Sequence, residues 1–187
     1  MYPFARLAKE FVVHRNAPPL GLFDTHVSHH VCWPWDLDFL AELNNGRTLT
    51  LYDLGRMLLG KRSGLFAAMR RRGWGLTVAG SSTRYRRRVT AFARLEMRSR
   101  LAGWDDRFMY LEQSMWHRGE CTSHVLIRSA VIKGGRMVPT AEVLAEFGVE
   151  GTAPHLPDWI AAWAGAEALR PWPPMHEAPE NNRPLPH

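Results

Sequence analysis

Several side chains capable of acid–base or nucleophilic chemistry fall within thirteen residues, 35–47, which read WDLDFLAELNNGR. A carboxylate such as that of Asp38 can attack a carbonyl carbon or take a proton from water. Asn44 or Asn45 can cap the start of a helix, whose first turn carries backbone N–H groups without helical partners. We therefore predict that the backbone amides near Asn45 and Gly46 donate hydrogen bonds to an oxyanion.

The acids in this stretch also have a purely structural interpretation. Asp36 and Asp38 could accept hydrogen bonds from backbone N–H groups in a turn between a strand and a helix. From the residues alone, this structural role is open to both acids. Glu42 lies four residues after Asp38. It could form a general acid–base pair with Asp38, or it could weaken Asp38 as a nucleophile.

The flanking patterns place this stretch between a strand and a long helix. Residues 25–33 alternate, with Thr25, Val27, His29, Val31 and Trp33 on one face, which predicts a strand. From Asn45 onward, Leu51, Leu54 and Leu58 recur at intervals of three and four residues. This spacing predicts an amphipathic helix that ends at Gly60 or Gly64, with one or two further helical turns over residues 65–72.

Four more strands are predicted after Gly73. They span residues 74–88, 91–104, 107–117 and 121–133, and turn signals at 104–107 and 118–120 separate the last three. The long helix must bury its apolar stripe, and the concave face of the sheet is the available surface. The predicted fold class is therefore α+β, with a central helix packed on a five-stranded antiparallel sheet.

Three segments follow from these patterns: an N-terminal arm over 1–23, a domain over 24–138 and a C-terminal extension over 139–187. The extension is predicted to hold a short helix over 141–147 and a second helix over 156–169. Six of the thirteen prolines fall in residues 171–187, which predicts a Pro-rich extended tail.

Residues 35–47 closely resemble the hotdog-fold thioesterases of the 4-hydroxybenzoyl-CoA type. In that family an Asp-x-Asp pair ends the first strand, and His-x-Asn-Asn, a small residue and Arg open the central helix. Residues 95–107, followed by Tyr110-Leu111-Glu112, are similar to the subgroup represented by thioesterase superfamily member six. The resemblance covers about residues 24–133.

The resemblance implies a hotdog fold and hydrolysis of an acyl-CoA thioester to a free acid and coenzyme A. It implies that Asp38, the second acid of the pair, is the catalytic one, and it leaves Asp36 the structural role. It also implies that two or four copies assemble as a homodimer or homotetramer. Glu42 departs from the pattern because it stands where the family has histidine. A non-catalytic acyl or acyl-CoA binding protein with this fold is therefore the alternative.

Arginines are concentrated between residues 70 and 100, where ten of them face a single acid, Glu96. Such a segment indicates an anionic partner or a solvated face. The resemblance makes coenzyme A the candidate anion, and we predict that Arg84, Arg86 and Arg88 bind its phosphates from one strand face. The alternative is that they are solvated charges on an edge strand. A nucleic-acid partner is not expected because no nucleic-acid-binding module is recognised.

Other sequence features bear on the cellular location and on metal or cofactor binding. Two cysteines are too few for a disulfide framework, no apolar run has the length of a membrane span, and Lys9 and Glu10 interrupt any signal-like start. A cytoplasmic location is expected. His26, His30 and Cys32 would share a strand face with zinc-compatible groups, but no fourth ligand accompanies them, so neither a metal nor another cofactor is expected.

Overall fold

The computed structural model describes residues 2–149 and 156–174. The chain divides into two compact units, residues 1–154 and residues 155–187. The first unit contains α1 (Phe4–Val13), β1 (His26–Val31), a 3₁₀ turn η1 (Pro34–Asp36), α2 (Asn45–Arg62), α3 (Leu65–Arg72), β2 (Gly75–Tyr85), β3 (Arg94–Trp104), β4 (Met109–His117), β5 (Glu120–Lys133), β6 (Arg136–Met137) and α4 (Thr140–Ala145). The second contains α5 (Asp158–Leu169).

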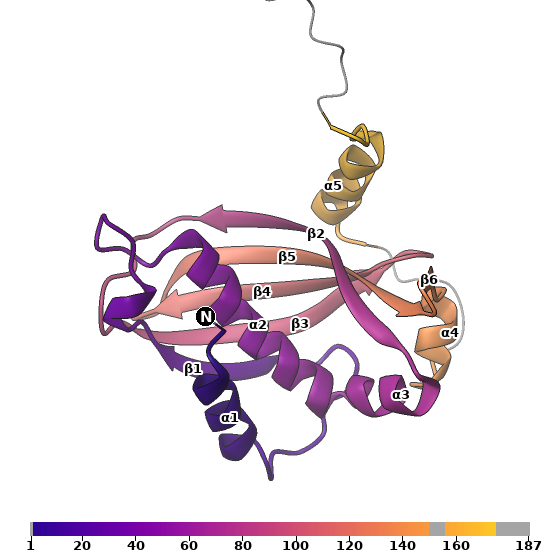
Figure 1. Ribbon diagram of the computed structural model, residues 1–187, viewed down its shortest axis with the longest axis horizontal. Helices are drawn as coiled ribbons and strands as arrows, with labels where there is room; N and C mark the ends of the chain where they lie inside the picture. Colours follow the sequence, from indigo (N-terminus) through magenta and orange to yellow (C-terminus); the bar gives the residue numbers. More distant parts are fainter. Residues whose placement is uncertain (1, 150–155, 175–187) are drawn as a thin grey trace, which may run out of the picture. The chain divides into compact units, whose positions relative to one another are not determined.

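The first unit is a curled antiparallel sheet with helices against one face (Figure 1). The strand order is β1-β3-β4-β5-β2, and the short strand β6 pairs with the end of β5. The five predicted strands are confirmed, while β6 was not predicted. β1 and β2 form the two edges, so the strand that follows the central helix lies farthest from the strand that precedes it.

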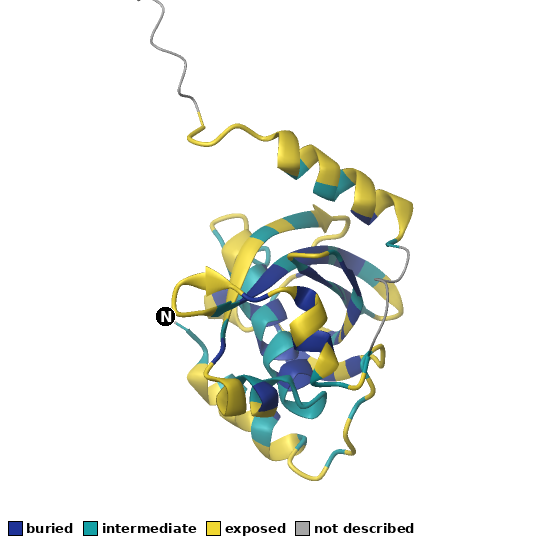
Figure 2. Ribbon diagram, turned by 90° about the vertical axis from the view of Figure 1, so that its right-hand side faces the viewer, coloured by how far each residue is buried: buried dark blue, intermediate teal, exposed yellow. Residues whose placement is uncertain are grey.

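The central helix α2 packs on the concave face of the sheet, as its apolar spacing predicts (Figures 1 and 2). Leu51, Leu54 and Leu58 are completely buried. Gly55 lets the helix approach closely, because a Cβ there would lie 2.5 Å from the Ser99 Oγ on β3. The helix and the sheet therefore share one core, and the predicted long central helix is confirmed.

The buried stripe gives a direct test of this packing. Replacing Leu54 with alanine is expected to lower the free energy of unfolding by about 2 to 5 kcal/mol, because apolar contacts are lost and a cavity remains. Urea denaturation followed by circular dichroism measures the change. Leu40→Ala is the matched control, because Leu40 is 62% exposed. A loss below 1 kcal/mol in Leu54→Ala would contradict the packing.

Helices at the start and the end of the first unit pack on its core. α1 lies against α2, where the Tyr2 hydroxyl donates to Asp53 over 2.8 Å. α4 contributes Val143 and Leu144 to the buried cluster that contains Trp74 and Trp104. The predicted domain boundaries at residues 23 and 138 remain predictions. α1 precedes the first boundary and α4 follows the second, and both helices pack on the core of the first unit. Most of the predicted Pro-rich tail, residues 175–187, lies outside the described residues.

Both predicted C-terminal helices are present, as α4 and α5, with bounds shifted by one or two residues. Among the residues that the structure describes, no helix combines the length and apolar character needed to cross a membrane.

Candidate active site

The site begins with the cap of α2. The Asn44 side chain accepts hydrogen bonds from the N–H groups of Gly46 at 2.9 Å and Arg47 at 3.2 Å, which fixes the first turn of the helix. One of the two predicted oxyanion donors, the Gly46 amide, is therefore already paired in this conformation. The Asn45 N–H has no hydrogen-bond partner within residues 2–149 and 156–174 and is the donor that remains.

Asp36 has the structural role that the sequence predicts. Its completely buried carboxylate accepts hydrogen bonds from Arg6 at 2.6 Å, from Arg47 at 3.0 and 3.2 Å, and from the Trp33 N–H at 2.9 Å. Burial alone would raise the pKa of Asp36, but these hydrogen bonds outweigh burial and lower it. Asp36 thus ties α1 and α2 to the turn after β1.

Asp38 caps a tight turn. Its Oδ1 accepts the Leu40 N–H at 2.9 Å and the Glu42 N–H at 3.4 Å, while Ala41 adopts a left-handed backbone with φ of 57°. No described residue donates to Asp38 Oδ2, so one carboxylate oxygen remains for chemistry. The structural role left open by the sequence is present, and a catalytic role remains a prediction.

A hollow of about 240 Å³ lies beside the start of α2, and we call it the N-terminal hollow. Its lining includes Glu42, Asn45, Arg86, Arg88, Thr122 and Ser123. Glu42 pairs with Arg88 at 3.0 Å across it. The structure therefore brings together two predicted catalytic residues and two predicted phosphate-binding arginines, whereas Asp38 is not among the lining residues.

The arginine prediction is corrected in its geometry. β2 ends at Tyr85, so Arg86 and Arg88 lie in the connection that follows rather than on a strand. The strand ends here because the N–H groups of Arg86 and Arg87 both donate to the Thr122 carbonyl, at 2.8 and 3.1 Å, which breaks the alternating ladder. Arg84 precedes Tyr85 on the strand and points to the opposite face, so the three arginines do not share one face.

Polar groups on β5 complete the wall of the N-terminal hollow. The buried Tyr52 hydroxyl and Ser123 Oγ are hydrogen-bonded at 2.8 Å, joining α2 to β5. The Tyr85 hydroxyl donates to the Asn45 carbonyl at 3.4 Å. Sequence reasoning missed Thr122 and Ser123, since nothing in the alternating pattern of β5 distinguishes them before its pairing with β2 is known.

A separate apolar cavity of about 220 Å³ lies farther along α2, between that helix, α3 and the sheet. Its lining includes Met57, Phe66, Leu76, Val78, Leu101 and Phe147. Asp53 and Arg56 also line it, and they pair with each other at 2.8 Å. The cavity suits a hydrocarbon or aromatic group because its polar side chains are mutually satisfied.

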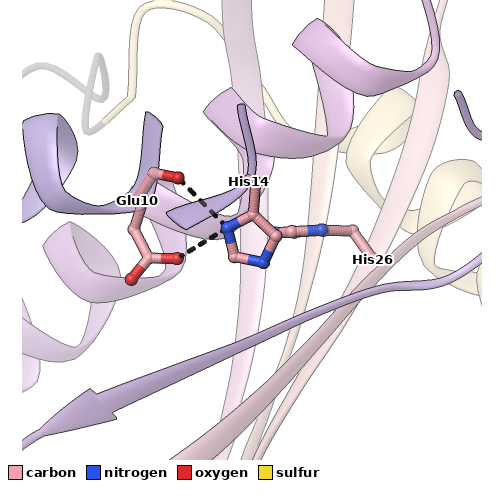
Figure 3. A group of neighbouring side chains, drawn as sticks. All are labelled: Glu10, His14 and His26. Atoms are coloured by element: carbon pink, nitrogen blue, oxygen red, sulfur yellow. Dashed lines mark hydrogen bonds and ion pairs between the residues drawn. The ribbon is translucent and has the colours of Figure 1, made fainter. Parts of the chain in front are cut away.

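A cluster of Glu10, His14 and His26, of which Glu10 and His26 are buried and His14 is partly buried, joins the end of α1 to β1 (Figure 3). The carbonyl and the carboxylate of Glu10 both face His14 Nδ1, at 3.1 and 3.5 Å. Arg62 donates to His26 Nδ1 at 3.0 Å, so neutral His26 carries its proton on Nε2 and has no lone pair there for a metal. Burial lowers the pKa of His26 to about 4, which keeps the ring neutral.

This cluster replaces the group that the strand pattern indicated. His26 and His30 do share the buried face of β1, and Cys32 is buried just beyond it. Among the described residues, however, His26 forms a group with Glu10 and His14, while His30 Nδ1 lies 3.9 Å from the Glu10 carboxylate and Cys32 is not part of the group. The packing of α1 on β1 brings Glu10 and His14 to His26. No local pattern in the sequence predicts this contact, because the residues lie on different elements.

The fold is that of a hotdog protein of the thioesterase type. A family profile described as Thioesterase-like superfamily matches residues 32–164, so the chain belongs to that superfamily. Protein THEM6 of Xenopus laevis is 33% identical over 143 residues, which cover 76% of this chain and 68% of that relative. The resemblance drawn from residues 35–47 and 95–112 is confirmed.

Solved structures agree with the fold. The probable thioesterase YbaW of Escherichia coli superposes with a TM-score of 0.61 at 21% identity, covering 65% of this chain and 94% of that one. A Thermus thermophilus thioesterase complexed with coenzyme A and Zn gives a TM-score of 0.58 at 21% identity, covering 68% and 93%. At these identities the likeness establishes the hotdog architecture.

Proposed function

We propose that the protein hydrolyses acyl-CoA thioesters to a free acid and coenzyme A. The observation that carries the proposal is the N-terminal hollow, which combines the Glu42 carboxylate, the unpaired Asn45 amide and arginines at the start of the central helix. Asp38 lies in the adjoining turn, where its Oδ1 accepts the Glu42 N–H. Its chemistry matches what a thioester carbonyl and a phosphate-bearing leaving group require. Membership of the thioesterase-like superfamily supports the same reaction.

In this proposal Asp38 attacks the thioester carbonyl or takes a proton from the attacking water. The Asn45 N–H at the start of α2 stabilises the oxyanion. When the carbonyl re-forms, the C–S bond breaks and the thiolate of coenzyme A leaves. Attack by Asp38 gives a mixed anhydride, which water hydrolyses to the free acid and the Asp38 carboxylate, whereas attack by water gives the free acid directly. The Gly46 amide could join only if the Asn44 side chain released it. The apolar cavity along α2 is the candidate compartment for the acyl group, which favours acyl groups without charge.

The direct experiment is a hydrolysis screen with short, medium, long and aromatic acyl-CoAs, in which released thiol is measured. Turnover that saturates with substrate supports the proposal. Absence of thiol release from every substrate overturns it.

Arg86 and Arg88 are proposed to hold the phosphates of coenzyme A. The double variant Arg86→Glu, Arg88→Gln is expected to raise KM about tenfold or more and to leave kcat largely intact, because binding loses charge-assisted hydrogen bonds. Arg88 is only neutralised, since a glutamate there would face Glu42. Steady-state kinetics at several salt concentrations measure the effect.

Two comparisons sharpen that test. Arg84→Glu is expected to change KM less than the double variant because Arg84 lies on the other strand face. Arg136→Glu, at an exposed position on β6, is the charge control. An unchanged KM in the double variant would make Arg86 and Arg88 solvated surface charges.

A non-catalytic acyl-CoA binding protein is the second candidate. The observation in its favour is that Asp38 Oδ1 and the Gly46 N–H are both used by local turn and cap hydrogen bonds. Acyl-CoA binding without thiol release would identify this function.

The homodimer or homotetramer expected from the resemblance is part of the same proposal. The edge strand β2 offers unpaired backbone groups, and exposed Leu76 and Val78 accompany them. Nucleic acid is not a proposed partner, and the cytoplasmic location remains a prediction.

A further inference from the structure

A hollow of about 660 Å³ lies at the β1 edge of the sheet and shares no lining residue with the N-terminal hollow or the apolar cavity. Its walls come from α1, β1, β3 and the end of the β4–β5 hairpin. Lys9 Nζ donates to the His29 carbonyl at 2.8 Å, which holds α1 beside this edge. The volume falls within the range of small-molecule sites. We call it the basic hollow.

Cations dominate the lining of the basic hollow. Five basic residues and one acid, Glu96, line it, and the basic residues are Arg6, Lys9, Arg94, Arg98 and Arg118. Three of the five have carboxylate partners, since Arg6 pairs with Asp36, Lys9 with Glu10 and Arg98 with Glu96. Among the residues that the structure describes, no carboxylate pairs with Arg94 or Arg118. These two guanidinium groups leave the hollow positively charged and able to bind an anion.

Two tryptophan rings add flat apolar surfaces. Trp33 stacks on Trp35, with 5.4 Å between ring centroids and 13° between planes. The Arg98 guanidinium lies 4.7 Å from the centroid of Trp116, whose Nε1 donates to Ser114. Each ring is thus held by a neighbour against one face, and Trp33 remains 37% exposed. Both rings line the same hollow as the unpaired arginines.

We propose that the basic hollow binds a nucleotide, with its phosphates on Arg94 and Arg118 and its base stacked on Trp33 or Trp116. Guanidinium groups bind phosphate oxygens in pairs, and indole rings stack on bases. A single nucleotide fits better than a nucleic-acid strand because, among the described residues of β3, the unpaired cations do not continue beyond the hollow. Farther along β3, Arg100 is neutralised by Glu112 at 2.6 Å.

The site does not depend on the proposed thioesterase activity, and its test measures binding alone. ADP is titrated into the wild-type chain and into the Arg94→Glu, Arg118→Glu double variant by calorimetry. The control is Arg70→Glu, Arg136→Glu, which makes the same charge change at exposed positions outside the hollow. We expect ADP affinity at least tenfold weaker in the first variant and unchanged in the control. Thermal unfolding of each variant verifies that it is folded.

Further titrations test whether the base stacks on the tryptophans and identify the source of the nucleotide. Trp33→Leu with Trp116→Leu is expected to weaken ADP binding and to leave pyrophosphate binding unchanged. Coenzyme A is titrated in parallel: loss of its affinity in the Arg94→Glu, Arg118→Glu variant identifies its nucleotide portion as the ligand, and unchanged affinity identifies a free nucleotide.

Three results overturn the proposal. Equal ADP affinity in the two double arginine variants removes Arg94 and Arg118 from binding. Pyrophosphate binding as tight as ADP binding reduces the hollow to a general anion surface. An affinity that rises steadily with oligonucleotide length assigns it to nucleic acid instead.

Discussion

Asp36→Asn is expected to lower the free energy of unfolding by about 3 to 5 kcal/mol, the usual cost of removing one partner from a buried ion pair. The amide has nearly the same shape, so little packing is lost. The charge that faces Arg6 and Arg47 disappears, however, and both guanidinium groups remain in a largely buried setting. Urea denaturation at pH 7 measures the loss.

The pH dependence of this loss has a definite sign. The pKa of Asp36 is lower in the folded chain than the value of about 3.9 expected for an unfolded aspartate. The stabilisation is therefore complete above pH 5 and declines as the pH falls through the folded-state pKa. The difference between wild type and Asp36→Asn should shrink in the same direction.

Asp106→Asn provides the matched control. Asp106 is exposed, and its substitution is expected to change stability by no more than about 0.5 kcal/mol. An equally small change in Asp36→Asn would contradict the role of Asp36 in tying α1 and α2 to the turn after β1.

Local spacing explains which parts of the fold could be predicted. Leu51, Leu54 and Leu58 recur at helical intervals, and their burial requires only that a sheet lie nearby. The strands after Gly73 alternate between short turn signals, so their number and order follow from the sequence. The cap at Asn44 is equally local, because the side chain and the amides it accepts from lie within three residues.

Contacts between distant residues explain what could not be predicted. Arg84, Arg86 and Arg88 continue an alternating pattern without a turn residue, and only the pairing of Arg86 and Arg87 with Thr122 ends the strand. The Glu42–Arg88 pair spans two connections whose approach depends on the whole sheet. The basic hollow likewise assembles residues from positions 6 to 119.

Asp38→Asn is expected to retain the fold and to lower turnover by about 10² to 10⁴-fold if Asp38 is the nucleophile or base. The variant separates the two roles because asparagine keeps the Oδ1 acceptor for the Leu40 and Glu42 N–H groups. It removes only the charge and the free oxygen, Oδ2. Acyl-CoA hydrolysis in a folded variant measures the effect, and Asp106→Asn is the control for loss of an exposed carboxylate.

Substitution of Glu42 tests which of the two acids performs the chemistry. The test is needed because Glu42 lines the N-terminal hollow and Asp38 does not. If Asp38 is catalytic and Glu42 is a tolerated departure from the family, Glu42→His should preserve or raise turnover. If Glu42 has taken over acid–base work, Glu42→His and Glu42→Gln should both reduce turnover, and Asp38→Asn should reduce it less. Full activity in a folded Asp38→Asn variant would contradict a catalytic role for Asp38. Asparagine keeps the hydrogen bonds from the Leu40 and Glu42 N–H groups, so capping this turn would then be the whole role of Asp38.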